Sequence, residues 1–238
     1  MTKVDKRLYT KEEWHRIRAE RRKENAQHPK IDTTSKPKTN ANSNAPIAFV
    51  LGNGTSREHV PLPDLKERGT VYACNAVYRD FNPDFLVAVD TKMVLEIAQS
   101  GYQMNNQVWT NPNKVYSSIK NLNFFDPPKG WSSGPTALDM ASRHGFQEIY
   151  ILGFDYKGLQ DKINNMFADT KNYKRSKDRA TYYGNWLRQT AITVEKNNKT
   201  RYIRVIRPND FVPPELLRLS NVEHITVEKF MKQFNISR

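Results

Sequence analysis

Small and polar residues follow four short apolar runs in this chain. The four segments are Gly52-Asn53-Gly54-Thr55-Ser56, Cys74-Asn75-Ala76, Asp90-Thr91-Lys92 and Gly153-Phe154-Asp155-Tyr156. If the apolar runs are parallel strands of one sheet, their carboxyl ends meet at one edge, where such sheets bind ligands. We therefore expect four side chains to face a common ligand: Asn53, Asn75, Asp90 and Asp155. Since Asn and Asp also cap helices and close turns, any one of them alone would indicate only a turn.

The first segment has the composition of a phosphate-binding turn. The apolar run Ile47–Leu51 ends in Gly52-Asn53-Gly54. Glycine lets the main chain bend sharply and approach a ligand closely, and oriented N–H groups can form a concave anion site. A nucleotide or sugar nucleotide is therefore the first ligand to consider. The segment lacks the full G-x-G-x-x-G fingerprint and the Gly-Lys-Ser/Thr of a P-loop, so a plain turn is an equally good interpretation.

The start of a helix is a second candidate for an anion site. Ser132-Ser133-Gly134-Pro135 precedes an apolar helical pattern. The N–H groups of a first helical turn lack partners inside the helix, and the helix dipole favours a negative charge there. Pro135 suits this position because proline has no N–H to lose. An ordinary helix cap explains the same residues equally well.

A basic segment lies between residues 171 and 207. It contains 11 Lys or Arg residues against two acidic residues, with aromatic residues interleaved. Cations that follow phosphates and rings that stack on bases are typical of a nucleic-acid groove. The candidates for such contacts are Lys174, Arg175, Lys177, Tyr182 and Trp186. Helical spacing predicts that Tyr183 packs on the sheet instead, and the basic charge would equally serve a phosphorylated ligand.

The composition limits the class of protein. The chain has 238 residues, 37% of them hydrophobic, which is enough for one domain with a core and an appendage. A formal net charge of +13 favours a polyanionic partner, such as nucleic acid, a phosphorylated substrate or an anionic membrane. The single cysteine, Cys74, excludes an internal disulfide framework and fits a reducing cytosol. We expect no transmembrane segment and no secretory signal, hence a cytoplasmic protein.

Two regions of the chain differ in composition. Residues 1–45 carry 12 Lys or Arg against 6 Asp or Glu, a net charge of +6, and predict a basic arm made of a charged helix and a flexible linker. Residues 46–238 predict an α/β domain, with a Rossmann-like, mostly parallel sheet and helices on both of its faces. The expected strands are Ile47–Leu51, Thr70–Cys74, Phe85–Val89, Gln107–Thr110, Glu148–Leu152 and Arg201–Ile206. The expected helices are Thr91–Gln99, Pro135–His144, Lys177–Lys196 and Val227–Gln233.

Four motifs, in this order, resemble those of a known group of enzymes. They are Leu-Gly-Asn-Gly-Thr-Ser, Tyr-Ala-Cys-Asn-Ala-Val-Tyr, Ser-Ser-Gly-Pro-Thr-Ala and Glu-Ile-Tyr-Ile-Leu-Gly-Phe-Asp-Tyr, spread over residues 46–160. The pattern looks like the bacterial sialyltransferases that use CMP-sialic acid. It equally resembles the related motility accessory factors and hydroxymethylpterin-pyrophosphokinase-like proteins. The resemblance implies a Rossmann-like fold that binds a nucleotide-activated donor, with no further cofactor and no metal-binding Asp-x-Asp motif.

The resemblance also implies roles for individual residues. Six residues would bind the donor: Asn53, Gly54, Thr55, Asn75, Ser133 and Gly134. The glycine turn would approach the phosphates, the asparagine of the second motif would contact the ribose or base, and the helix start would hold the sugar or a phosphate. Tyr156 would stabilise the leaving phosphate through its hydroxyl. In the related enzymes, the region that follows forms a lid over the donor.

The chain departs from the sialyltransferases at two points. No histidine lies between Tyr156 and His224, where those enzymes carry a histidine base. Asp90 stands where they use a neutral amide, and its carboxylate would repel a carboxylated sugar, which argues against sialic acid as the donor. Asp90 or Asp155 could act as the general base instead.

We therefore expect a glycosyltransferase that moves a sugar from a nucleotide-activated donor to a hydroxyl acceptor without a metal ion. Its catalytic candidates are Asp90, Asp155 and Tyr156. One alternative is a nucleotidyl or pyrophosphoryl transferase that binds Mg²⁺ through the two aspartates. The other is a non-catalytic, nucleic-acid-associated protein that uses its basic segments. The sequence leaves the oligomeric state open, and its basic excess would suit a phage-encoded protein.

Overall fold

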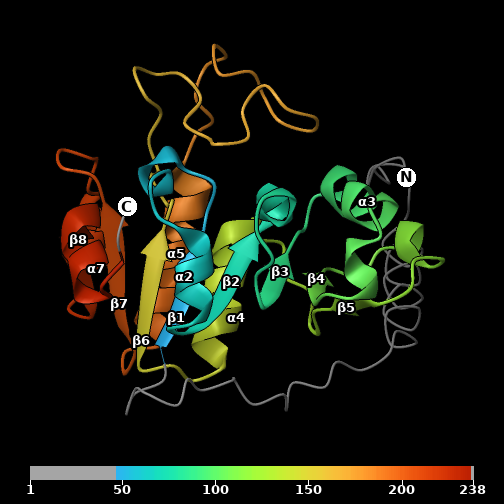
Figure 1. The fold of residues 1–238 in the computed structure, drawn as a ribbon, viewed down its shortest axis with the longest axis horizontal. Helices are drawn as coiled ribbons and strands as arrows, with labels where there is room; N and C mark the ends of the chain where they lie inside the picture. Colours follow the sequence, from blue (N-terminus) through green and yellow to red (C-terminus); the bar gives the residue numbers. More distant parts are fainter. Residues whose placement is uncertain (1–46, 237–238) are drawn as a thin grey trace, which may run out of the picture.

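The computed structural model describes residues 47–236, which form one eight-stranded sheet with helices on both faces (Figure 1). All neighbouring strands are parallel, in the order β5-β4-β3-β2-β1-β6-β7-β8. The strands are β1 Ile47–Leu51, β2 Thr70–Cys74, β3 Phe85–Val87, β4 Val108–Thr110, β5 Leu122–Phe124, β6 Glu148–Leu152, β7 Arg201–Ile206 and β8 Val222–Thr226. The predicted Rossmann-like α/β fold is thus confirmed, while the predicted N-terminal arm lies outside the described residues.

The order of the strands reverses next to β1. The chain first builds outward from β1 to β5, then crosses back and places β6 on the other side of β1. Phe49 of β1 consequently lies opposite Val71 of β2 on one side and Tyr150 of β6 on the other. In open α/β sheets, ligands bind beyond the strand ends at such a reversal. The fold therefore directs attention to the carboxyl ends of β1 and β6.

Helices cover both faces of the sheet because the strands are apolar on both sides. The α-helices are α2 Leu62–Lys66, α3 Thr91–Gln99, α4 Ser133–Arg143, α5 Gly184–Lys196, α6 Pro214–Leu217 and α7 Val227–Gln233. In β1, Phe49 and Leu51 belong to the core cluster that includes α2, α3 and α7, whereas Ala48 and Val50 belong to the cluster that includes α4, α5 and α6. This alternation follows from the two-residue period of a strand, and burial on both sides explains the continuous apolar runs.

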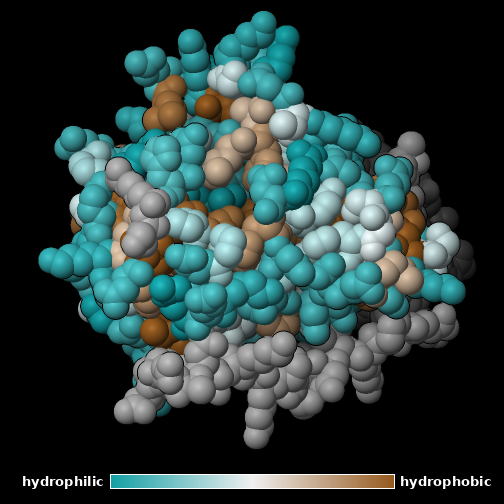
Figure 2. All heavy atoms as spheres, viewed as in Figure 1, coloured by the Kyte–Doolittle hydropathy of each residue, from teal (hydrophilic) through white to brown (hydrophobic). Residues whose placement is uncertain are grey.

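The longest connection lies above the carboxyl ends of the strands. Residues 153–183, between β6 and α5, contain no strand of the sheet and no helix, and they project from the fold in Figure 1. The space-filling view shows this projection as mostly hydrophilic, with isolated hydrophobic side chains (Figure 2). We call residues 157–183 the lid segment.

No helix in the described part of the chain is both long enough and apolar enough to span a bilayer.

The predicted elements are recovered, with two kinds of difference. All six expected strands form, but the short edge strands β5 and β8 were missing from the expected set. The helix expected over Lys177–Lys196 begins only at Gly184. Residues before it pair within the lid segment instead: Arg179 forms a β-bridge with Lys162, and the Ala180 amide donates to the Asp161 carbonyl at 2.8 Å. These non-local contacts outweigh local helix propensity.

Candidate functional site

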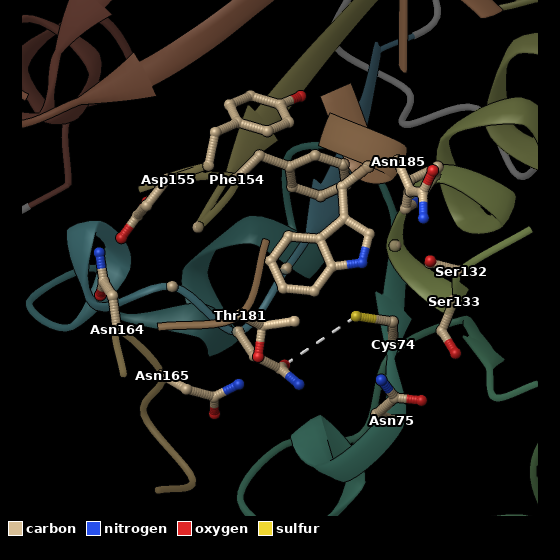
Figure 3. Close-up of a pocket in the computed structure, with 18 of the residues that line it drawn as sticks. Cys74, Asn75, Ser132, Ser133, Phe154, Asp155, Asn164, Asn165, Thr181 and Asn185 are labelled. Carbon is tan, nitrogen blue, oxygen red and sulfur yellow. Dashed lines mark hydrogen bonds between the residues drawn. The ribbon is translucent and has the colours of Figure 1, made fainter. Parts of the chain in front are cut away.

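A cleft of about 450 Å³ opens at the carboxyl ends of β1, β2, β3 and β6, beside the first turn of α4. Figure 3 shows Asp155 and Asn164 on one side of it, Ser132 and Ser133 on the other, and Asn75 below Cys74 on the side of the serines. The lid segment and the start of α5 complete the wall. The four strand ends singled out in the sequence therefore do meet at one cavity, as their order predicted.

The glycine turn after β1 is held against the end of β6. The Gly52 amide donates to the Leu152 carbonyl at 2.8 Å, and the Gly54 amide donates to the Gly153 carbonyl at 2.9 Å. A Cβ on Gly52 would lie 2.4 Å from the Gly153 oxygen, so only glycine allows this close approach. These glycines therefore serve the packing of one strand end on another, and their amides are not available to a phosphate.

The next two amides of the turn are also occupied. The Thr55 amide and hydroxyl donate to Asn164 Oδ1 at 3.1 and 2.7 Å. The Ser56 amide donates to Asp155 Oδ2 at 3.1 Å, and its hydroxyl donates to the other oxygen of the same carboxylate. Four of the five amides in the turn from Gly52 to Ser56 are thus engaged within the protein, two by main-chain carbonyls and two by side chains. An anion in the cleft needs another set of donors.

Asp155, one of the expected catalytic residues, is a structural ligand of this turn. Both of its oxygens accept hydrogen bonds from Ser56, and it is only 8% exposed. A Cβ on Gly54 would lie 2.4 Å from the Asp155 Cγ atom, so the carboxylate rests directly on the glycine. The structure thus places Asp155 in the cleft wall with its acceptor oxygens already engaged.

Tyr156, the second expected catalytic residue, has its hydroxyl engaged by α5. Its backbone has a φ of 59°, which is unusual for a bulky side chain and marks a sharp turn after β6. The hydroxyl donates to Thr190 Oγ1 of α5 at 3.0 Å in a buried position. Burial raises the pKa of Tyr156 to about 12. The side chain therefore supports the wall between β6 and α5.

Two buried arginines lie beneath the strand ends, and the sequence analysis missed both. Arg204 of β7 is 1% exposed and donates to the carbonyls of Phe154 at 2.9 Å and Phe211 at 3.0 Å. Arg57 is 3% exposed, and its Nε donates to the Gly52 carbonyl at 2.6 Å. Burial lowers the pKa of each guanidinium, and the nearby Asp155 carboxylate opposes that shift. Asp80 also lies near Arg57 and Asp210 near Arg204, so carboxylates balance both buried guanidinium charges.

The start of α4 presents open donors to the cleft. Ser132 is its N-cap residue, and no side chain caps the helix. Within the described residues, the amides of Ser133 and Gly134 have no hydrogen-bond acceptor, as expected for a first turn. The Ser133 hydroxyl accepts from the Val89 amide at 3.1 Å, and Gln189 of α5 accepts from the Ser132 amide at 3.0 Å. These contacts fix the helix start against β3 and α5, with its two free amides at the cavity.

Asp90 and Asn75 complete the cleft from β3 and β2. Asp90 is exposed at the start of α3, makes no capping hydrogen bond and has no ion pair with any described residue. Asn75 adopts a φ of 54°, a conformation that asparagine tolerates better than most residues. Its Oδ1 atom is buried and has no hydrogen-bond partner among the described residues. Of the two expected aspartate bases, the structure thus leaves Asp90 free to act.

The lid segment is attached to the strand ends by specific hydrogen bonds. Tyr173 accepts from Asn53 Nδ2 at 2.9 Å and from the Ala76 amide at 3.2 Å. The Met166 amide donates to the Asn53 carbonyl at 2.8 Å. Arg79 donates to the Lys171 carbonyl at 2.9 Å and forms an ion pair with a glutamate of α3. Asn53 therefore holds the lid in place, which differs from the phosphate contact expected for it.

The proposed nucleic-acid residues lie on the outer side of this lid, except for Trp186. Lys174, Arg175 and Lys177 are all exposed, and Tyr182 is 77% exposed. Trp186 is 37% exposed and lines the cleft from the start of α5. Tyr183 is half-buried and packs on Phe211 with ring centroids 5.6 Å apart, which confirms its predicted place against the core.

Several polar residues that line the cleft could not be chosen from the sequence. They are Asn164, Asn165, Thr181, Asn185 and Gln189. All belong to the lid segment or to α5, and Thr181, Asn185 and Gln189 fall where the sequence predicted a continuous helix from residue 177. Among the described residues, no three His, Cys, Asp or Glu side chains gather into a group that could hold a metal ion.

No family model, no curated protein and no solved structure matches this chain.

Proposed function

We propose that the cleft binds a nucleotide-activated sugar and that the protein transfers the sugar to a hydroxyl acceptor. The observation that carries this proposal is the open first turn of α4, which faces a cavity at the strand-order reversal of a parallel sheet. Fixed N–H donors at a helix start favour a phosphate. A volume of about 450 Å³ is large enough for a nucleotide-sized ligand.

The donor phosphates lie, in this proposal, at the start of α4 rather than at the glycine turn. The free amides of Ser133 and Gly134 and the uncommitted Ser132 hydroxyl supply hydrogen bonds to them. When the sugar leaves the phosphate, negative charge grows where these preorganised groups stabilise it.

Asp90 is the general base of the proposed reaction. A base must be free to take the proton of the acceptor hydroxyl. Asp90 is exposed and has no ion pair or capping hydrogen bond among the described residues, whereas Asp155 is engaged by Ser56. The missing histidine of the sialyltransferases is thus replaced by a carboxylate from the end of β3. The metal-dependent alternative requires both aspartates as ligands, and the engagement of Asp155 gives it no support.

A substitution at the helix cap tests the proposed phosphate site. Ser132→Asp adds a carboxylate at the start of α4 but keeps a good capping residue, so the fold is retained while an anion is repelled. Ser132→Asn is the neutral control of nearly the same shape. We expect calorimetry with CMP, UDP and GDP to show binding to the wild type and to Ser132→Asn, and at least about tenfold weaker binding to Ser132→Asp, or about 1.4 kcal/mol. Equal affinities in both variants would contradict the site.

A nucleic-acid-associated role is the second candidate, and it is favoured by the exposed cations of the lid segment. Lys174, Arg175 and Lys177 project with the exposed ring of Tyr182 nearby in the sequence. Neutralising the three cations with glutamine should lower the slope of log affinity against log salt for single-stranded DNA or RNA by about two units, since each phosphate contact on a single strand contributes about 0.7. An unchanged slope would exclude the lid as the binding surface.

A further inference from the structure

A second cavity of about 370 Å³ adjoins the proposed donor cleft. Its lining includes Asn75, Asp90, Thr91, Lys92, Asn172 and Tyr173. Asn75 and Asp90 line both cavities, so these two residues stand where one space meets the other. A transferase that joins two substrates needs two such neighbouring spaces with the reacting groups between them.

The polar groups of the second cavity are suited to an uncharged ligand with several hydroxyls. Asn75 Oδ1 is buried without a partner among the described residues, and it can accept a hydrogen bond from a hydroxyl. An apolar ligand would leave this atom unpaired, which carries a free-energy cost. The two charged side chains of this lining, Asp90 and Lys92, carry opposite charges, so the cavity has no net charge that would favour an anion or a cation. Lys92, exposed on α3, can donate to the oxygens of a neutral ligand without requiring a charge on it.

The remaining wall is held rigidly in place by the lid segment. Asn172 Nδ2 donates to Glu96 Oε2 of α3 at 2.7 Å, and the Tyr173 hydroxyl accepts from Asn53 and Ala76. The guanidinium of Arg79 lies 5.8 Å from the centre of the Tyr173 ring. These contacts fix the two residues of the lid segment that line the cavity. The second space is therefore a built cavity and not a gap in a loose loop.

We propose that the second cavity is the acceptor subsite and that it binds a neutral carbohydrate. This inference rests on the proposed glycosyl transfer. An acceptor hydroxyl beside Asp90 attacks the anomeric carbon of the donor, and a new carbon–oxygen bond forms. The bond from that carbon to the phosphate oxygen breaks, and the nucleotide leaves with the electron pair. The hydroxyl proton passes to the Asp90 carboxylate, so that atoms and charge balance.

Ligand-detected NMR with the full chain tests the subsite. The probes are the methyl glycosides of glucose, galactose, mannose and N-acetylglucosamine, with CMP, UDP and GDP for the first cavity. Thr91→Trp fills the second cavity with an indole, and Lys92→Trp is a second blocking variant from the same helix. Gln99→Trp places the same side chain at the exposed far end of α3 and serves as the matched control.

We expect saturation transfer to at least one glycoside in the wild type and in Gln99→Trp, and its loss in both blocking variants. Nucleotide binding should stay unchanged in all of them, because the blocked residues do not line the first cavity. Absence of any glycoside signal, or a signal that survives both blocking variants, would overturn the acceptor subsite. Absence of nucleotide binding would instead overturn the proposed donor site, so the two failures are distinguishable.

Discussion

Asp155→Asn separates a structural role of this carboxylate from a catalytic one. The substitution keeps the shape of the side chain but removes its charge and replaces one acceptor oxygen by an NH₂ donor. In the structure both oxygens accept from Ser56, through its amide and its hydroxyl, at a position only 8% exposed. The Asn oxygen can still accept from the Ser56 amide and the new NH₂ group can donate to the Ser56 hydroxyl, so the main loss is the negative charge.

The expected loss of stability follows from these contacts. A hydrogen bond to a charged group contributes about 1.5–3 kcal/mol, whereas one between neutral groups contributes about 0.5–1.5 kcal/mol. Removal of the charge also takes away one of the carboxylates that lie near the buried Arg57 and Arg204. Because such effects are not additive, we expect Asp155→Asn to lower the free energy of unfolding by about 2–4 kcal/mol. For a domain of this size that corresponds to a fall in Tm of about 5–15 °C.

Thermal unfolding followed by circular dichroism measures the effect, with Asp90→Asn as the matched control. Asp90 is exposed and unpaired, so the same change there should alter stability by less than about 0.5 kcal/mol. In a transfer assay, by contrast, Asp90→Asn should have the larger effect of the two variants, since it should remove activity while the protein remains folded. An Asp155→Asn variant with the Tm of the wild type would refute the structural role and return Asp155 to the candidates for a general base.

Three further outcomes test the surroundings of the cleft. Gly54→Ala should lower the free energy of unfolding by more than about 2 kcal/mol, since its Cβ would lie 2.4 Å from the Asp155 Cγ atom. Gly134→Ala should stay within about 1 kcal/mol of the wild type in urea unfolding, because its Cβ meets only a ring atom, at 3.3 Å, and alanine favours the helix. Burial and a neighbouring arginine lower the pKa of His224 to about 4, below the usual value of about 6.5. The stability that neutral His224 contributes is therefore present above about pH 6.5 and lost as the pH falls through 4. Between about pH 6.5 and 4, the free energy of unfolding should fall less in His224→Gln than in the wild type. The same dependence on pH in both proteins would contradict this prediction.

The sequence predicted the architecture from local patterns alone. Apolar runs such as Thr70–Cys74 and Glu148–Leu152, bounded by polar turns, coincide with β2 and β6. Helix α3 begins and ends where its apolar period and the glycine at position 101 indicate, since Gly101 follows with a φ of 74°. Strand β5 was missed because three residues with one fully buried side chain carry little periodic signal.

The roles of the cleft residues depended on partners that are distant in the chain. Gly54 and Asp155 are far apart in the sequence, yet the carboxylate rests on the glycine because β6 returns to lie beside β1. The same return brings Arg204 beneath the end of β6. A glycine followed by polar residues therefore has the same local signature whether its amides bind a phosphate or a neighbouring strand.

A parallel α/β sheet and the residues at its strand ends could be predicted from local patterns, because strand period and turn composition are local properties. Which of these residues remain open to a ligand depends on contacts formed only in the folded chain. Crossing of the chain from β5 to β6 engages the glycine turn and Asp155 with each other, and it leaves Asp90 and the first amides of α4 free. That distinction rests on hydrogen bonds between segments about a hundred residues apart, and no local pattern encodes them.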